Sequence, residues 1–288
     1  MSFLLEICVD TFESAVAAIQ GGADRLELCS ALSEGGLTPT VGLLRQIKQY
    51  LSDPPKIVPV YCMIRCRRGS DFCYSEQEMS VMLWDLQLLA QHGADGFVFG
   101  ALEPSGMVHR NHCEQIVAAA RKLPLTFHRA IDCTEEERLE ENLNLVAQLG
   151  FSTILTSGLK PTAEQGMETI VRMKTMATNI EKVTGKSLRL MPGSGISTEN
   201  VLNILQRTGC DAIHGSASIV KPSDTVTRTL PMGASNVDAL PLKVCSTAKV
   251  QEIRRLIDSI DANGDVHFQL VPTLGYTKMF WLFLVDSQ

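Results

Sequence analysis

Apolar and polar positions follow two different periods along this chain. Short apolar runs, typical of buried strands, alternate with longer segments in which apolar residues recur every three or four positions, as on one face of a helix. The clearest helical segment covers residues 76–92, and one of its faces carries Met79, Met82, Leu83, Leu86, Leu89 and Ala90. Such strict alternation predicts parallel βαβ units whose strands are buried.

A helix–glycine–strand motif recurs four times along the chain. A helical segment ends in a glycine, which tolerates the left-handed backbone of a helix C-terminus, and a short apolar strand follows. The glycines are Gly22, Gly93, Gly150 and Gly209, and their strands are expected at residues 25–29, 96–99, 153–155 and 212–214. Four further strands are expected between these, at residues 4–9, 57–65, 125–129 and 187–191.

Eight such strands, each followed by a helix, favour an α/β fold closed into a (β/α)8 TIM barrel. The helix–glycine–strand motif repeats every ~60 to 70 residues, which is roughly a quarter of a barrel of about 250 residues. The alternative, a doubly wound open sheet, usually carries a glycine-rich phosphate-binding turn after its first strand, and residues 9–11 are Val-Asp-Thr. We therefore expect one barrel domain over residues 1–260, with an irregular excursion after strand eight and a C-terminal tail over residues 261–288.

The amino-acid composition argues against several classes of protein. With 45% hydrophobic residues the chain can bury a large core, which excludes wholesale disorder. A net charge of -6 without a basic stripe argues against a nucleic-acid partner, and no apolar run is long enough to predict a membrane span. The chain enters an apolar strand directly after Met1 without a basic leader segment, so we expect a cytoplasmic protein. Its nine cysteines, an odd and scattered set, predict reduced thiols.

In a TIM barrel the functional side chains lie where strands end and βα loops begin. The expected strand ends carry Glu6, Cys8, Glu27, Cys29, Met63, Arg65, His128, Arg129, Thr156, Ser157, His214 and Ser216. A carboxylate inside an apolar strand is costly to bury unless it is paired, so Glu6 and Glu27 are expected in a polar network with Arg65, His128 or Arg129. That network could hold the barrel mouth together or act as an acid/base set.

Two glycine turns follow the last two strands. Gly193 and Gly195 come after the seventh strand, and Gly215 with Ser216 comes at the end of the eighth. Barrels often bind phosphate at these two loops through backbone N–H groups, so the four residues are a candidate anion site. The alternative is that the glycines only make tight turns.

Sulfur atoms suggest a metal site. Cys8, Cys29 and Met63, on three neighbouring strands, would be soft ligands of the kind that prefers Cu(I), although a strand cysteine can also be a small core residue. The spacing of Cys62, Cys66 and Cys73 matches no zinc pattern. His109 and His112 could hold a metal or form the solvated first turn of a helix.

Several strings resemble the CutC copper homeostasis family. They are LLEICVD, GADRLELCS with SEGGLTPT, MIR with DFCYS, TFHRAID, LTSG and MPGSGI, in this order between Phe3 and Ala217. The resemblance implies an eight-stranded parallel barrel, a cytoplasmic protein linked to Cu(I) binding, and a homo-oligomer. Residues that match the family pattern are Glu6, Cys8, Glu27, Cys29, Arg65, His128, Arg129, Thr156, Ser157 and Gly193. The chain departs from that pattern in the loop at residues 66–70, which lacks the usual proline and is one residue longer, and in the tail.

Two hypotheses follow. In the first, a cytoplasmic copper homeostasis protein binds Cu(I) through thiols at the barrel mouth, chiefly Cys8 and Cys29. In the second, a barrel enzyme of lyase, isomerase or hydrolase type acts on a small phosphorylated or anionic metabolite, with Glu27 and His128 as acid/base pair, Arg65 and Arg129 on the anion, and Glu6 in the same network. Copper would use the thiols, whereas catalysis would use the carboxylates. No organic cofactor is evident.

Overall fold

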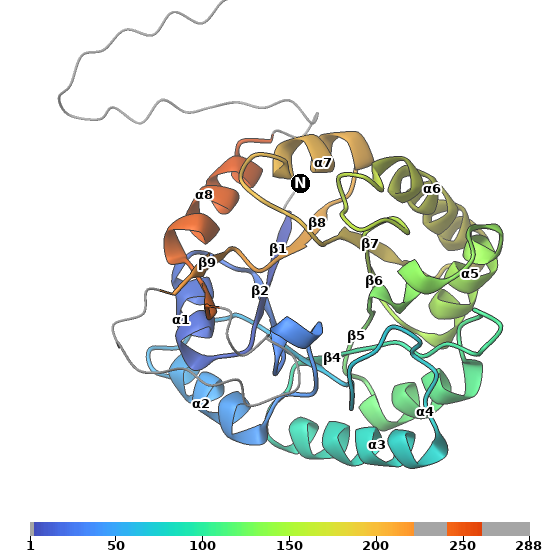
Figure 1. The fold of residues 1–288 in the computed structure, drawn as a ribbon, viewed down its shortest axis with the longest axis horizontal. Coiled ribbons are helices and arrows are strands. Elements are labelled where there is room, and N and C mark those ends of the chain that lie inside the picture. The colour runs from blue at the N-terminus through green and yellow to red at the C-terminus, as the bar shows by residue number, and fades with distance from the viewer. Residues whose placement is uncertain (1–2, 222–240, 261–288) are drawn as a thin grey trace, which may run out of the picture.

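The computed structural model describes residues 3–221 and 241–260, in which eight parallel strands form a barrel inside a ring of helices (Figure 1). The barrel strands are β1 (Leu4–Val9), β2 (Arg25–Leu28), β3 (Val60–Met63), β4 (Gly96–Phe99), β5 (Leu125–Phe127), β6 (Thr153–Thr156), β7 (Arg189–Pro192) and β8 (Ala212–Gly215). The α-helices are α1 (Phe12–Gln20), α2 (Val41–Ser52), α3 (Glu76–Gln91), α4 (Arg110–Ala120), α5 (Leu139–Leu149), α6 (Met167–Thr184), α7 (Val201–Thr208) and α8 (Thr247–Asp258). The predicted TIM barrel is confirmed.

Strand order follows the chain, because β1 to β7 pair in sequence and β8 pairs with β1. β7 and β8 lie side by side without a shared ladder and close the ring. The register sets Glu6 beside both Arg25 and His214, and Cys8 beside Glu27. Residues that are far apart in the sequence therefore meet around β1.

Local signals in the sequence explain the helix ends. Ser75 and Glu78 form a reciprocal capping box at the start of α3. Gly150 and Gly209, two glycines of the helix–glycine–strand motif, end α5 and α7 in the left-handed conformation with φ of 102° and 63°. Among the helices of the described residues, none is both long and apolar enough to cross a bilayer.

The third and fifth strands are shorter than the apolar runs suggested. β3 begins only at Val60, after a proline-rich approach in which Ile57 is 97% exposed. β5 ends at Phe127, because His128 caps a short 3₁₀ helix over Arg129–Cys133. His128 and Arg129 therefore lie beyond the strand, at the barrel mouth.

Two apolar clusters occupy opposite parts of the barrel interior. Cys29, Tyr61, Met63 and Val98 form one, on β2 to β4, and Leu155, Met191 and Ala212 form the other, on β6 to β8. Arg25 spans them: its guanidinium carbon lies 4.2 Å from the centre of the Tyr61 ring, and its Nη2 lies 3.5 Å from the Met191 sulfur. The wall between the clusters, on β1, β2 and β8, carries charged side chains.

The two described ends of the excursion after β8 pair with each other. β9 (Ser218–Val220) and β10 (Lys243–Cys245) pair as a small antiparallel sheet. Residues 222–240 and the predicted tail at residues 261–288 lie outside the described residues.

The altered loop at residues 66–70 is anchored by Arg67. Its guanidinium donates to Glu78 and Asp71 and to the backbone carbonyl of Cys73. The Gly69 carbonyl in turn accepts from Arg65 at 2.8 Å. The longer loop therefore helps to hold an arginine of the barrel mouth.

Candidate functional site

A buried carboxylate links β1 to both of its neighbours. Glu6, with no exposed surface, accepts from Arg25 Nε at 2.5 Å and from His214 Nδ1 at 2.7 Å. Burial alone would raise the pKa of Glu6, but the charges of Arg25 and His214 lower it. Glu6 is therefore an ionised carboxylate that fixes the orientation of the His214 ring.

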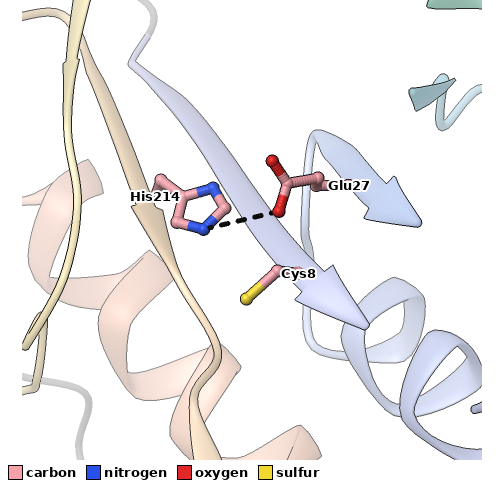
Figure 2. Close-up of side chains that lie close together, drawn as sticks. All are labelled: Cys8, Glu27 and His214. Atoms are coloured by element: carbon pink, nitrogen blue, oxygen red, sulfur yellow. Dashed lines mark ion pairs between the residues drawn. The ribbon is translucent and has the colours of Figure 1, made fainter. Parts of the chain in front are cut away.

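His214 turns its other nitrogen toward a second glutamate. Nε2 lies 3.8 Å from Glu27 Oε2, and the Cys8 thiol points into the same space (Figure 2). The ligand atoms of Cys8, Glu27 and His214 all lie within 4.8 Å of one another. Three strands, β1, β2 and β8, thus bring a thiol, a carboxylate and an imidazole to one point.

The charges of this trio are set by burial and by one another. Burial raises the pKa of Glu27. Burial would lower the pKa of His214, but the neighbouring Glu27, Cys8 and Glu6 raise it well above 6.5. The imidazole is therefore protonated at neutral pH, and a metal ion would have to replace the proton on Nε2.

The trio has spare bonding capacity. Within the described residues, Glu27 Oε1 has no hydrogen-bond partner although it is buried. The half-buried Cys8 thiol lies 3.6 Å from the Gly215 carbonyl and also contacts the His214 side chain. A thiolate and an imidazole are both ligands that copper accepts, and the carboxylate of Glu6 on the far nitrogen of the histidine is the usual arrangement behind a metal-bound imidazole. The residues present therefore fit a copper ion.

Cys29 and Met63 lie beside this trio rather than in it. The fully buried Cys29 thiol contacts Glu27 Oε2 at 3.6 Å, and burial raises its pKa well above 9.0. Met63 packs with Cys29 in the apolar cluster of β2 to β4 and borders the cavity described below. Of the two predicted cysteine ligands, Cys8 joins a group of potential metal ligands within the described residues and Cys29 does not.

A cavity of about 630 Å³ opens from the trio toward the barrel mouth. Cys8, Glu27 and His214 line one part of it, and Arg65, His128 and Arg129 line another. Glu6 lies below it, outside the lining. The volume is in the range of small-molecule sites.

The expected network of Glu6 and Glu27 exists, but its partners differ from those expected. Arg65 donates to backbone carbonyls of Glu34, Gly36 and Gly69. Arg129 pairs with Asp132 at 2.9 Å and donates to Ser157. The partners of the glutamates are Arg25 and His214, because register sets both beside Glu6.

Asp132 organises the loop after β5. It accepts from Arg129 Nε, from the Thr156 hydroxyl and from the backbone N–H and hydroxyl of Ser157. Thr156 and Ser157, matched to the family pattern, therefore act here as donors to one carboxylate. Asp132 was missed in the sequence because it lies five residues beyond the end of β5, within the 3₁₀ helix.

The two glycine turns lie outside the cavity lining, which of these loops includes only Ser194. A side chain at Gly193 would meet Leu155 Cδ1 at 2.6 Å, and Gly195 has a φ of +74°. The Gly215 carbonyl accepts from Cys8, and the Ser216 hydroxyl donates to Ser218. Tight packing explains why residue 193 is a glycine, and the left-handed backbone explains why residue 195 is one. Anion binding at Gly193, Gly195, Gly215 and Ser216 stays a prediction.

His109 and His112 form neither a metal group nor a wholly solvated turn. His109 caps α4 through its side chain, and the two rings stack with centres 3.6 Å apart. His112 is buried, 2% exposed, and contacts Glu76 at 3.2 Å. The contacts that the structure shows for both rings are those of helix capping and packing.

The chain is similar to several known proteins. The CutC family model matches residues 3–219. A copper homeostasis protein cutC homolog of Drosophila melanogaster is 42% identical over 241 residues, covering 81% of this chain and 87% of that protein. The homolog of Homo sapiens is 41% identical over 261 residues, covering 90% of each chain.

Solved structures agree with the fold. A crystal structure of a CutC from Streptococcus agalactiae superposes with a TM-score of 0.68 at 29% identity, over 74% of this chain and 98% of that one. Phosphoribosyl anthranilate isomerase of Thermotoga maritima, with a TM-score of 0.53 and 14% identity over 90% and 99% of the two chains, shares the barrel fold alone. The family match over residues 3–219 and the identities to the fly and human proteins show that this chain belongs to the CutC family.

Proposed function

We propose that this protein binds Cu(I) at the mouth of its barrel as part of copper homeostasis, with Cys8 and His214 as the principal ligands and Glu27 beside them. The observation that carries the proposal is the convergence of the three ligand atoms within 4.8 Å. The copper homeostasis names of the fly and human relatives support the choice of metal.

Each residue has a separate task in this proposal. Cys8 supplies the soft thiolate and His214 the imidazole nitrogen, both suited to copper. Glu6 holds the ring by Nδ1, which leaves Nε2 as the only free nitrogen. Glu27 is a hard ligand for Cu(I), and it lies beside the ion with its Oε2 3.8 Å from His214 Nε2.

The cellular setting follows from the thiols. All cysteines in the described residues are free, and a copper-binding thiolate must stay reduced, as it does in the cytoplasm. We therefore propose a cytoplasmic protein. A homo-oligomer also stays a prediction, supported by an apolar stripe of Val81, Trp84 and Leu88 that lies exposed on α3.

Competition against a Cu(I) chelator tests the function. The parent protein should hold one copper ion, and Cys8→Ser should weaken binding at least about 100-fold, since the soft ligand is lost. Cys62→Ser, on β3 and packed in the outer core, is the matched control and should bind as the parent does. Equal binding by Cys8→Ser and the parent would reject the site.

The alternative, a barrel enzyme acting on a small anionic metabolite, rests on Arg65 and His128 across the cavity. The Nδ1 of His128 already accepts from the Ala130 N–H at 3.1 Å, and burial together with Arg65 and Arg129 lowers the pKa of the ring to about 3. Such a histidine is a hydrogen-bond donor at neutral pH rather than a base. The acid/base pair of Glu27 and His128 stays a prediction, and a chemical step has no support beyond the cavity itself.

A further inference from the structure

Two buried donors of the cavity wall lack partners. Arg65 Nε and His128 Nε2 have no hydrogen bond to any part of the chain that the structure describes. Arg65 is 7% exposed and His128 is 4% exposed, and both line the cavity. An unmade hydrogen bond on a buried polar group is costly, so two of them on one cavity wall point to a ligand.

The charge of Arg65 is also uncompensated. Its Nη1 donates to the carbonyls of Glu34 and Gly36 and its Nη2 to that of Gly69, at 2.8 to 3.1 Å. No carboxylate of residues 3–221 or 241–260 lies within ion-pair distance of it. Three carbonyls thus fix the guanidinium, and Nε–H is left as a preset donor carrying positive charge.

In His128, the hydrogen-bond donor of the neutral ring is Nε2. Because Nδ1 accepts from the Ala130 N–H, the proton of the neutral ring must be on Nε2. Gly100 makes room for this ring, since a Cβ there would meet Nδ1 at 2.5 Å. The ring therefore cannot shift toward β4, and its Nε2–H has no partner within the described residues.

Phe72 ties the two donors together. Its ring centre lies 4.9 Å from that of His128, and the Arg65 guanidinium carbon lies 5.4 Å from it. All three residues line the same cavity. A charged N–H donor and a neutral N–H donor therefore lie beside one aromatic ring of the cavity wall, and both are groups that bind oxyanions.

We propose that this wall of the cavity binds the oxyanion group of a small organic anion, a carboxylate or a phosphate, through Arg65 Nε–H and His128 Nε2–H. The donors lie on the β3 and β5 side of the barrel, whereas the copper ligands lie on β1, β2 and β8. The anion site is therefore independent of copper, and metal-free protein should retain it.

Calorimetric titration of the metal-free, full-length protein tests this site, with malonate and inorganic phosphate as probes at constant ionic strength. Saturable binding of either anion is expected, and the preferred one identifies the oxyanion as carboxylate or phosphate. His128→Phe keeps an aromatic ring but removes the Nε2–H donor. Arg65→Lys keeps the positive charge but removes the guanidinium group and its Nε–H donor. Each should weaken binding at least about tenfold.

Matched substitutions outside the cavity control the experiment. His92→Phe and Arg45→Lys, both in residues that line a different surface hollow, should leave binding unchanged. Binding of neither anion, or equal binding by His128→Phe and the parent, would overturn the proposal.

A second measurement covers the case in which a variant does not fold. In a long-range ¹H–¹⁵N spectrum of the parent, the His128 Nε2–H resonance should shift as malonate or phosphate saturates the site. A resonance that stays unchanged at saturating concentrations of both anions would equally overturn the proposal.

Discussion

His214 is held between two glutamates, with Nδ1 2.7 Å from Glu6 and Nε2 3.8 Å from Glu27. The first contact orients the ring, and the second leaves room for an ion. The same ring is therefore both a structural link between β8 and β1 and the residue that distinguishes the proposed copper site from a purely thiol site.

Removing the charge of Glu6 should destabilise the barrel. Glu6→Gln leaves the buried Arg25 guanidinium without its carboxylate, and breaking a buried pair in this way costs about 3 to 5 kcal/mol. Urea unfolding followed by circular dichroism measures the loss. Glu114→Gln, in an exposed pair with Arg110, should change stability by less than about 1 kcal/mol, and equal losses in the two variants would contradict the account.

The pH dependence of stability should report His214. Its pKa in the folded state is raised above 6.5, so its contribution is fully present below about pH 6.5 and is lost as pH rises through the folded pKa. The stability difference between the parent and His214→Asn should therefore shrink as pH is raised from 6.5. Unfolding curves at several pH values test this, and a difference that grows with pH would reverse the assigned sign.

Copper affinity should fall as pH falls. The ion must replace the proton on His214 Nε2, so the dissociation constant should rise about tenfold per pH unit for each proton that binding releases. Chelator competition between pH 6 and 8 measures this slope. His214→Asn should lower the slope by one proton, and an unchanged slope would show that the histidine stays protonated in the complex.

Gly100 should be needed for the position of His128. A methyl group there would lie 2.5 Å from Nδ1 and 2.6 Å from Cε1, so Gly100→Ala must displace the ring, at about 1 to 3 kcal/mol. Thermal and urea unfolding measure the cost. Gly42→Ala in α2 meets nothing within 4 Å and should instead stabilise by about 0.5 to 1 kcal/mol.

A stabilised Gly100→Ala variant would contradict this packing. If the variant folds, its affinity for malonate or phosphate should also fall, because the Nε2–H donor moves with the ring.

The barrel could be predicted because its signals are local. The glycine that follows each of four helices and the apolar run after it depend on a few adjacent residues, and β1 matched its expected bounds, Leu4–Val9. The ends of β3 and β5 could not be predicted as well, because apolar residues such as Ile57 continue outside the sheet. Which residues meet inside the barrel depends on strand register, which the alternation of a single strand does not specify.

The candidate site shows the same limit. Period two placed Glu6 with Cys8 and Glu27 with Cys29 on common faces, and the structure brings Cys8 and Glu27 together. Arg25 was overlooked because it begins its strand, where an arginine is usually solvated. The sequence identified His214 only as one polar strand end among many, since nothing local shows that it lies opposite Glu6.

X-ray absorption at the copper edge of the Cu(I)-loaded protein tests the central claim most directly, because it identifies the atoms bound to the metal. We expect one sulfur, from Cys8, and one imidazole nitrogen, from His214, with the nitrogen signal lost in His214→Asn. A spectrum with two sulfur ligands and no imidazole, unchanged in His214→Asn and altered in Cys29→Ser, would contradict it and assign the copper to Cys8 and Cys29.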